Sequence, residues 1–98
     1  MTTDKYNGWT NYETWNVALW LDNEPGTYED ARRIIRIEPD DWQAGKNLRE
    51  YVESLPEIEG TLSSASMAAD LLGAALSEVS WDEIVGHYRE DENEDEDD

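Results

Sequence analysis

The chain has 98 residues, with 25 acidic and 7 basic side chains and a formal net charge of −18 at pH 7. This length supports a single hydrophobic core, and the absence of cysteine excludes disulfides and thiolate metal sites. Such a charge repels nucleic acid and anionic membranes and attracts basic surfaces, so direct nucleic-acid binding is disfavoured.

Membrane-spanning segments, signal peptides and the acidic last nine residues bear on the location and the domain boundary that we expect. There is no apolar run of membrane-spanning length and no signal-peptide pattern, so we expect a cytoplasmic protein without membrane contact, monomeric or dimeric. Residues 90–98 hold eight acids and no apolar side chain, which predicts a disordered acidic tail after a single helical domain over residues 1–89. Subtracting those eight from 25 leaves 17 acids against 7 bases, so the domain itself carries about −10.

The first predicted helix begins near Asn11, because Thr10 and Glu13 match the S/T-x-x-E capping box. It should end around 22–23, ahead of the Pro25-Gly26 turn signal. Residues 10–24 are rich in aromatic side chains. An α-helix that is apolar on most of its circumference is usually central, which predicts a core role for its tryptophans, Trp15 and Trp20.

Three more helices are expected before residue 80. Thr27 is positioned to cap a second helix that ends before Pro39, and Asp40 or Asp41 begins a third that reaches about Leu55. A loop over 56–60 follows, and Ser63 or Ser64 begins a fourth helix. The clearest apolar stripe of the chain lies on that fourth helix, at helical spacing: Ala68, Leu71, Leu72, Ala75, Leu76 and Val79.

A final helix is predicted by a second capping box, Ser80 and Glu83. Its apolar residues, Trp81, Ile84, Val85 and Tyr88, again recur at helical spacing, and no segment shows the sustained alternation of a β-strand. The sequence therefore predicts an all-α fold, a compact bundle of four to five short helices. In so small a core, the five tryptophans are expected to supply much of the apolar burial.

Only a few side chains suggest a site. The triplet Arg32, Arg33 and Arg36 has the chemistry to grip phosphate, but surface ion pairs with Glu29 are favoured at this spacing. His87 follows Glu83 by one turn; a helix-terminal role is favoured over catalysis or metal binding. No catalytic, cofactor-binding or metal-binding residue is assigned. Asn16 lies in mid-helix, where either a buried hydrogen bond or a partner contact would explain it.

Two segments resemble a family of small proteins of unknown function found in bacteriophages, plasmids and their bacterial hosts. Its signature is W-x-[TN]-Y-E-T-W-x-V-A-L-W-[IL]-x-N, here WTNYETWNVALWLDN at 9–23, and its members often close with a segment similar to WDEIVGHYRED at 81–91. The residues that match are Trp9, Tyr12, Glu13, Thr14, Trp15, Val17, Ala18, Leu19, Trp20, Asn23, Trp81, Glu83, Ile84, His87, Glu90 and Asp91. The resemblance implies a mobile genetic element. By analogy, small acidic proteins of such elements frequently inhibit host defence, some by mimicking the charge of DNA.

The leading hypothesis is therefore a non-enzymatic acidic binding protein that inhibits a host defence nuclease, of the CRISPR–Cas or restriction type. As a DNA mimic it would occupy the basic nucleic-acid groove of that nuclease. The candidate partner-binding residues, besides the tail, are Asn16, Asp22, Glu24, Glu29, Asp30, Glu38, Asp40, Asp41, Glu50, Glu53, Glu57 and Glu59.

Two other classes remain open. One is an acidic interaction module without a defence role, whose charge reflects halophilic adaptation or solubility and whose specificity lies around Tyr12, Trp15 and Asn16. The other is a small enzyme, for which Glu83 and His87 are the only supporting pair.

Overall fold

The computed structural model describes residues 6–96, with side chains placed through Asp91. Within that range the chain is all-α, as predicted, but it forms six helices rather than four or five, because the expected loop after Pro56 is itself helical. The helices are α1 (Tyr12–Asn23), α2 (Pro25–Arg36), α3 (Asp41–Glu53), α4 (Pro56–Leu62), α5 (Met67–Glu78) and α6 (Trp81–Glu96).

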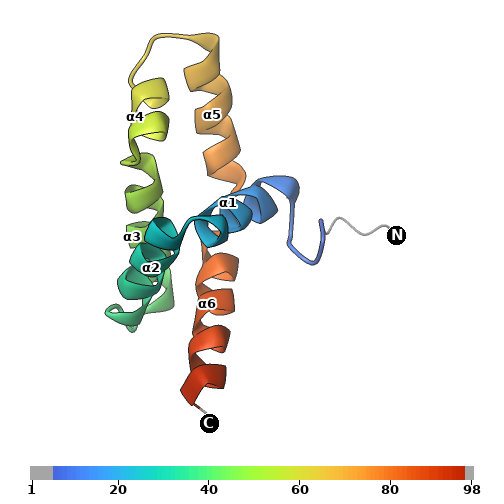
Figure 1. Ribbon diagram of the computed structural model, residues 1–98. Helices are drawn as coiled ribbons and strands as arrows, with labels where there is room; N and C mark the ends of the chain where they lie inside the picture. Colours follow the sequence, from blue (N-terminus) through green and yellow to red (C-terminus); the bar gives the residue numbers. More distant parts are fainter. Residues whose placement is uncertain (1–5, 97–98) are drawn as a thin grey trace.

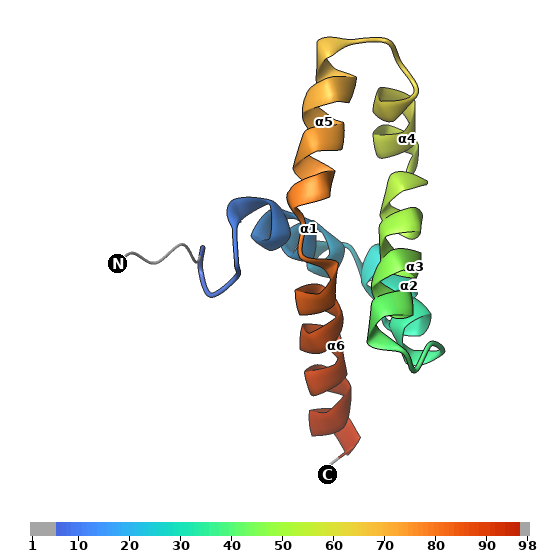
Figure 2. The same ribbon diagram turned by 180° about the vertical axis from the view of Figure 1, so that it is seen from behind.

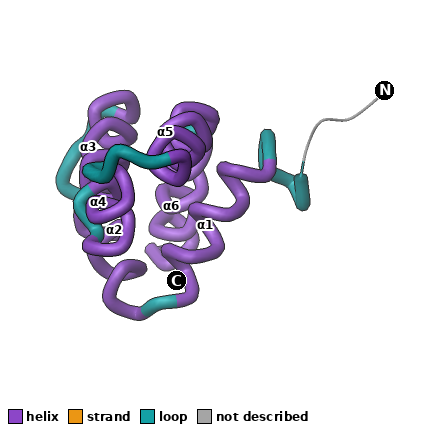
Figure 3. Tube along the Cα trace, turned by 90° about the horizontal axis from the view of Figure 1, so that it is seen from above, coloured by secondary structure: helices purple, strands orange, loops and turns teal. Residues whose placement is uncertain are grey.

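The helices form two columns side by side, with α1 and α2 lying across them (Figures 1 and 2). One column holds α3 followed by α4, and the other holds α5 followed by α6. Helix α3 packs on α6, α4 packs on α5, and α2 contacts both α3 and α6. Seen from above, α1 passes alongside the column of α5 and α6 (Figure 3). The hairpin of α4 and α5 is an arm that extends beyond the four-helix body.

Two predicted helix starts are wrong. Helix α2 begins at Pro25 with Glu24 as its N-cap, because the fixed φ of proline suits the first helical position. Thr27 instead donates its hydroxyl to the carbonyls of Leu21 and Glu24. Helix α5 begins only after Ser66, whose hydroxyl accepts a hydrogen bond from the amide of Ala69 at 3.1 Å.

The last helix extends further than expected. Helix α6 continues through Glu96, so residues 90–96 prolong it, and the predicted disorder of residues 90–98 is not confirmed. The final two residues lie outside the described range.

Apart from Tyr88 the core is aliphatic, which corrects the prediction that the five tryptophans supply much of the apolar burial. Trp20 and Trp42 are 59% and 62% exposed, and Trp9, Trp15 and Trp81 are only partly buried. On α5 only the end nearest α6 is buried, so most of its apolar stripe faces the surface or a groove described below. The buried apolar residues are Ala18, Leu21, Ala31, Ile35, Ala44, Leu48, Val52, Leu76, Val79, Ile84, Val85 and Tyr88.

Helices α3 and α6 come close because Gly45 faces the first turn of α6. A Cβ at this position would lie 3.3 Å from the Trp81 Cβ and 3.3 Å from an Asp82 carboxylate oxygen. A larger side chain would therefore separate the two helices.

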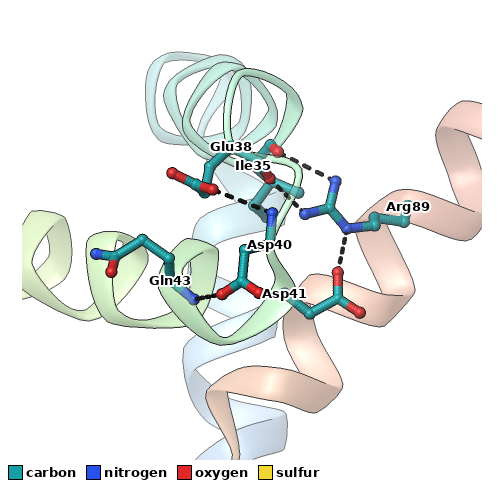
Figure 4. Close-up of polar contacts among 6 residues, drawn as sticks. All are labelled: Ile35, Glu38, Asp40, Asp41, Gln43 and Arg89. Atoms are coloured by element: carbon teal, nitrogen blue, oxygen red, sulfur yellow. Dashed lines mark hydrogen bonds and ion pairs between the residues drawn. The ribbon is translucent and has the colours of Figure 1, made fainter.

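Arg89 ties α6 to the segment between α2 and α3 (Figure 4). Its guanidinium donates to the Ile35 carbonyl at 3.2 Å and to the Glu38 carbonyl at 2.6 Å. It also pairs with the Asp41 carboxylate at 2.6 Å. One side chain thus satisfies carbonyls at the end of α2 and an acid at the start of α3.

The N-terminus of α1 is joined to the break between α5 and α6. The Asn11 carboxamide oxygen accepts from the Thr14 amide at 2.9 Å, and its nitrogen donates to the Glu78 carbonyl at 2.8 Å. Asn11 therefore caps the start of α1 and the end of α5 together, so the predicted N-cap role of Thr10 is wrong.

The Thr14 side chain completes this clasp, which we define as Asn11 and Thr14 with their partners Glu78 and Ser80. The Thr14 hydroxyl, 0% exposed, donates to Asn11 at 2.6 Å and accepts from the Ser80 amide at 2.8 Å. Ser80 and Glu83 do not form the predicted reciprocal capping box, because the Glu83 carboxylate instead accepts from the Thr10 amide at 3.1 Å.

Thr14→Val should lower the free energy of unfolding by about 1–3 kcal/mol, because it leaves the Ser80 amide without its acceptor at unchanged side-chain volume. Urea unfolding followed by circular dichroism measures this. The matched control is Thr61→Val, since the Thr61 hydroxyl bonds only to the Glu57 carbonyl of its own helix. Equal effects of the two substitutions would contradict the role of the clasp.

Candidate partner-binding groove

An apolar groove of about 380 Å³ opens between α1 and the arm of α4 and α5. The clasp positions its walls, since it fixes where α1 crosses the end of α5. The lining residues are mostly apolar and come from five helices and the segments between them: Tyr12, Glu13, Asn16, Val17, Trp20, Leu21, Glu24, Thr27, Val52, Leu55, Glu57, Ile58, Leu72, Ala75, Leu76 and Val79.

One wall is a ladder of three residues along α1, Tyr12, Asn16 and Trp20. They are four residues apart and so share one face of the helix. Tyr12 is 50% exposed and Trp20 59% exposed, which leaves two large aromatic side chains beside an apolar hollow. The predicted core role of Trp20 is therefore wrong.

Asn16 stands between these two aromatic residues. Its amide nitrogen lies 3.5 Å from the Tyr12 hydroxyl, a weak contact, and its carboxamide oxygen accepts no hydrogen bond from a described residue. The sequence left two explanations for the mid-helix position of Asn16, a buried hydrogen bond or a partner contact. The buried hydrogen bond is not formed. The side chain instead offers an amide group to the groove.

Three glutamates, Glu13, Glu24 and Glu57, stand at the rim. They come from α1, its C-cap and α4, and none forms an ion pair or side-chain hydrogen bond with another described residue. The groove thus combines an apolar interior with uncompensated negative charge.

The lysines and arginines are segregated away from this groove. Every lysine and arginine from residue 6 onward lies on α2, α3 or α6, whereas α1, α4 and α5 contain none. These three helices contact one another through α5, and we call them the acidic half. Together with the cap residue Glu24, their charged residues are Glu13, Asp22, Glu57, Glu59, Asp70 and Glu78.

The predicted partner-binding carboxylates fall into two groups. Glu24, Glu50, Glu57 and Glu59 have no side-chain partner among the described residues. The others take part in contacts within the domain. Glu29, Asp30, Asp41 and Glu53 pair with arginines, Glu38 and Asp40 accept backbone amides, and Asp22 accepts a tyrosine hydroxyl.

Two of these acids accept hydrogen bonds from tyrosines, the buried Tyr88 and the partly buried Tyr51. The Tyr88 hydroxyl donates to Asp22 at 2.7 Å, and the Tyr51 hydroxyl donates to Asp30 at 2.9 Å. Burial, together with the hydrogen bond to Asp30, raises the pKa of Tyr51 from 10.0 to about 12. Burial and the bond to Asp22 also raise the pKa of Tyr88. These carboxylates therefore stabilise the fold.

The other candidates from the sequence have local roles. Arg32 lies 4.0 Å from Glu29, as expected, whereas Arg33 pairs with Asp30 at 3.2 Å rather than with Glu29. Arg36 lies exposed on the same helix.

The suggested pair of His87 with Glu83 is not formed, and the expected helix-terminal position of His87 is wrong, because α6 continues to Glu96. Its Nε2 lies 3.8 Å from the Asp91 carboxylate, and its ring packs against Trp9 with centroids 5.1 Å apart. The described residues contain no cluster of three metal-ligating side chains. None of the helices in this range is long and apolar enough to span a bilayer.

The fold and the groove define a small all-helical domain with an open, acid-rimmed apolar site. The chain belongs to the family of unknown function DUF7249, which matches residues 2–95. Membership in a family of unknown function, expected from the sequence, is thereby confirmed. No curated protein and no solved structure matches the chain.

The groove could not be located from the sequence, but one signal was present. Two stretches, residues 6–31 and 50–88, have no lysine or arginine, and they contain all of the acidic half together with parts of α2, α3 and α6. Glu13, Asp70 and Glu78 belong to the acidic half and were missed, because the sequence alone does not show which segments adjoin.

Alkaline pH should destabilise the protein through Tyr51 and Tyr88. Since their pKa values are raised in the folded state, the unfolded chain releases protons first, and stability is lost as pH rises from about 10 to about 12. Urea unfolding at pH 8–12 measures the fall. The double variant Tyr51→Phe/Tyr88→Phe should reduce this loss of stability with rising pH. Tyr12→Phe, at an exposed site, should leave the loss unchanged. A flat profile in the wild type would contradict the assignment.

Proposed function

We propose that this protein is a non-enzymatic binding protein whose acidic half engages a basic surface of a nucleic-acid-binding partner. The segregation of charge carries the proposal, since α1, α4 and α5 hold acids without a single lysine or arginine. Acidity that served solubility alone has no need of such segregation. Glu13, Glu24 and Glu57 also lack intramolecular ion pairs with described residues, so their charge is available to a partner.

The finer proposal is that the partner is a host defence nuclease of the CRISPR–Cas or restriction type. Lysines and arginines that normally bind phosphates would bind these carboxylates, so the protein would compete with DNA. The net charge of −18 favours fast, steered association with such a groove. An enzymatic role has less support, because the one candidate pair, Glu83 and His87, is not formed.

Displacement of fluorescent duplex DNA from catalytically inactive restriction and RNA-guided nucleases tests this proposal. The protein should displace DNA, and its affinity for the nuclease should fall steeply between about 50 and 200 mM salt because ion pairs are screened. A salt-independent affinity, or no displacement from any nuclease tested, would contradict the DNA-mimic proposal.

Two triple variants with the same change in net charge locate the surface. Glu24→Gln/Glu57→Gln/Glu59→Gln, at the groove and on the arm, should weaken displacement by on the order of ten-fold. Glu50→Gln/Asp82→Asn/Glu90→Gln neutralises acids outside the acidic half, which also lack side-chain partners among described residues, and should have little effect. Equal weakening by both would show that only total charge matters.

The alternative, a halophilic or solubility-driven acidic module, predicts a different dependence on salt. A halophilic chain gains structure as salt approaches molar concentration, because self-repulsion is screened. Circular dichroism in dilute buffer distinguishes the two, since a functional acidic surface requires a domain that is already folded there.

A further inference from the structure

No residue of the described part of the chain fills the groove beside Trp20. Two large aromatic side chains, Tyr12 and Trp20, stand half or more exposed at an apolar hollow of about 380 Å³. Exposed tryptophan and tyrosine beside a hollow are the residue types that most often dominate binding energy in protein interfaces. A purely electrostatic mimic of DNA does not require such a hollow, so charge mimicry does not account for the groove.

We infer that the groove binds a basic amphipathic helix of the partner, with apolar side chains in the hollow and lysine or arginine side chains against the rim. This inference rests on the proposed function and specifies what the basic partner contributes. The site would then combine an apolar anchor with flanking ion pairs.

The chemistry of the groove selects this occupant. Its interior is apolar, and its rim carries Glu13, Glu24 and Glu57, which have no ion-pair partner among the described residues. A bound segment therefore needs apolar side chains on one face and positive charge at its edges. A second copy of this chain would bring two acid-rimmed grooves together at a net charge of −18 each, which like-charge repulsion opposes.

The shape of the groove favours a helix over an extended strand. Tyr12, Asn16 and Trp20 span nine residues of α1, a rise of about 12 Å. A helix lying along this wall presents apolar residues at i, i+3, i+4 and i+7 over a similar length. In addition, the described part of the chain has no exposed β-strand edge that an extended segment could join.

Fluorescence anisotropy with labelled synthetic peptides and the full-length protein tests the inference. The probe is a helical peptide of about 16 residues, with leucine at i, i+3, i+4 and i+7 and lysine elsewhere. A second peptide replaces leucine by alanine, and a third replaces lysine by glutamate. We expect the second to bind about ten-fold or more weakly and the third not to bind.

The chain offers a matched pair of protein variants. Trp20→Ala should weaken binding of the leucine–lysine peptide by about ten-fold or more. Trp42→Ala is the control, because Trp42 is exposed to a similar degree, at 62%, but lies on α3 in a separate hollow with Lys46 and Arg49. Circular dichroism verifies that both variants are folded, as their exposed side chains lead us to expect.

Three results would overturn the inference. They are equal effects of Trp20→Ala and Trp42→Ala, equal affinities of the leucine and alanine peptides, and a dimer in sedimentation velocity that Trp20→Ala dissociates. The last would make a second copy the occupant. In the first two cases salt-dependent displacement of DNA can persist, so the proposed function would survive. If no lysine-containing peptide binds and no DNA is displaced, the proposed function itself fails.

Discussion

The arrangement of this domain depends on the buried hydroxyl of Thr14. It donates to Asn11 and accepts from Ser80, so a single polar group in an apolar setting joins segments 66 residues apart in the chain. A buried hydroxyl is costly unless its hydrogen bonds are made, which confines α1 to one position relative to the break between α5 and α6. Residues from both segments that carry the family resemblance meet here, with Trp9 packed on His87 and Thr10 bonded to Glu83.

The clasp also produces the groove. The chain breaks near Ser80, so α5 and α6 are separate helices of one column, and α5 pairs with α4 in the arm (Figure 1). Helix α1 passes beside the base of this arm and leaves an apolar space that Leu72 and Ile58 line but do not fill. Apolar residues of α5 that would be buried in a closed bundle therefore remain available for binding.

Charge is organised by the same division. On α2, α3 and α6 several acids stabilise the fold, through arginines such as Arg89 and through the hydroxyl of Tyr51. On the acidic half no arginine or lysine is present, so carboxylates such as Glu57 keep their charge uncompensated. A partner that brings cations to this half meets no competing intramolecular pair, which is the physical basis of the proposed function.

The sequence by itself determined the helical class, the extent of α1 and α3, and the acidity, because capping residues, 3.6-residue periodicity and charge are local or additive properties. Tertiary structure decided which apolar faces are covered. Trp20 and Leu71 have the pattern of core residues, yet both are exposed, because among the described helices α5 contacts only α4 and α1, and the Trp20 face of α1 is left uncovered. Periodicity identifies an apolar face but not its neighbour, and the groove exists only because that neighbour is missing.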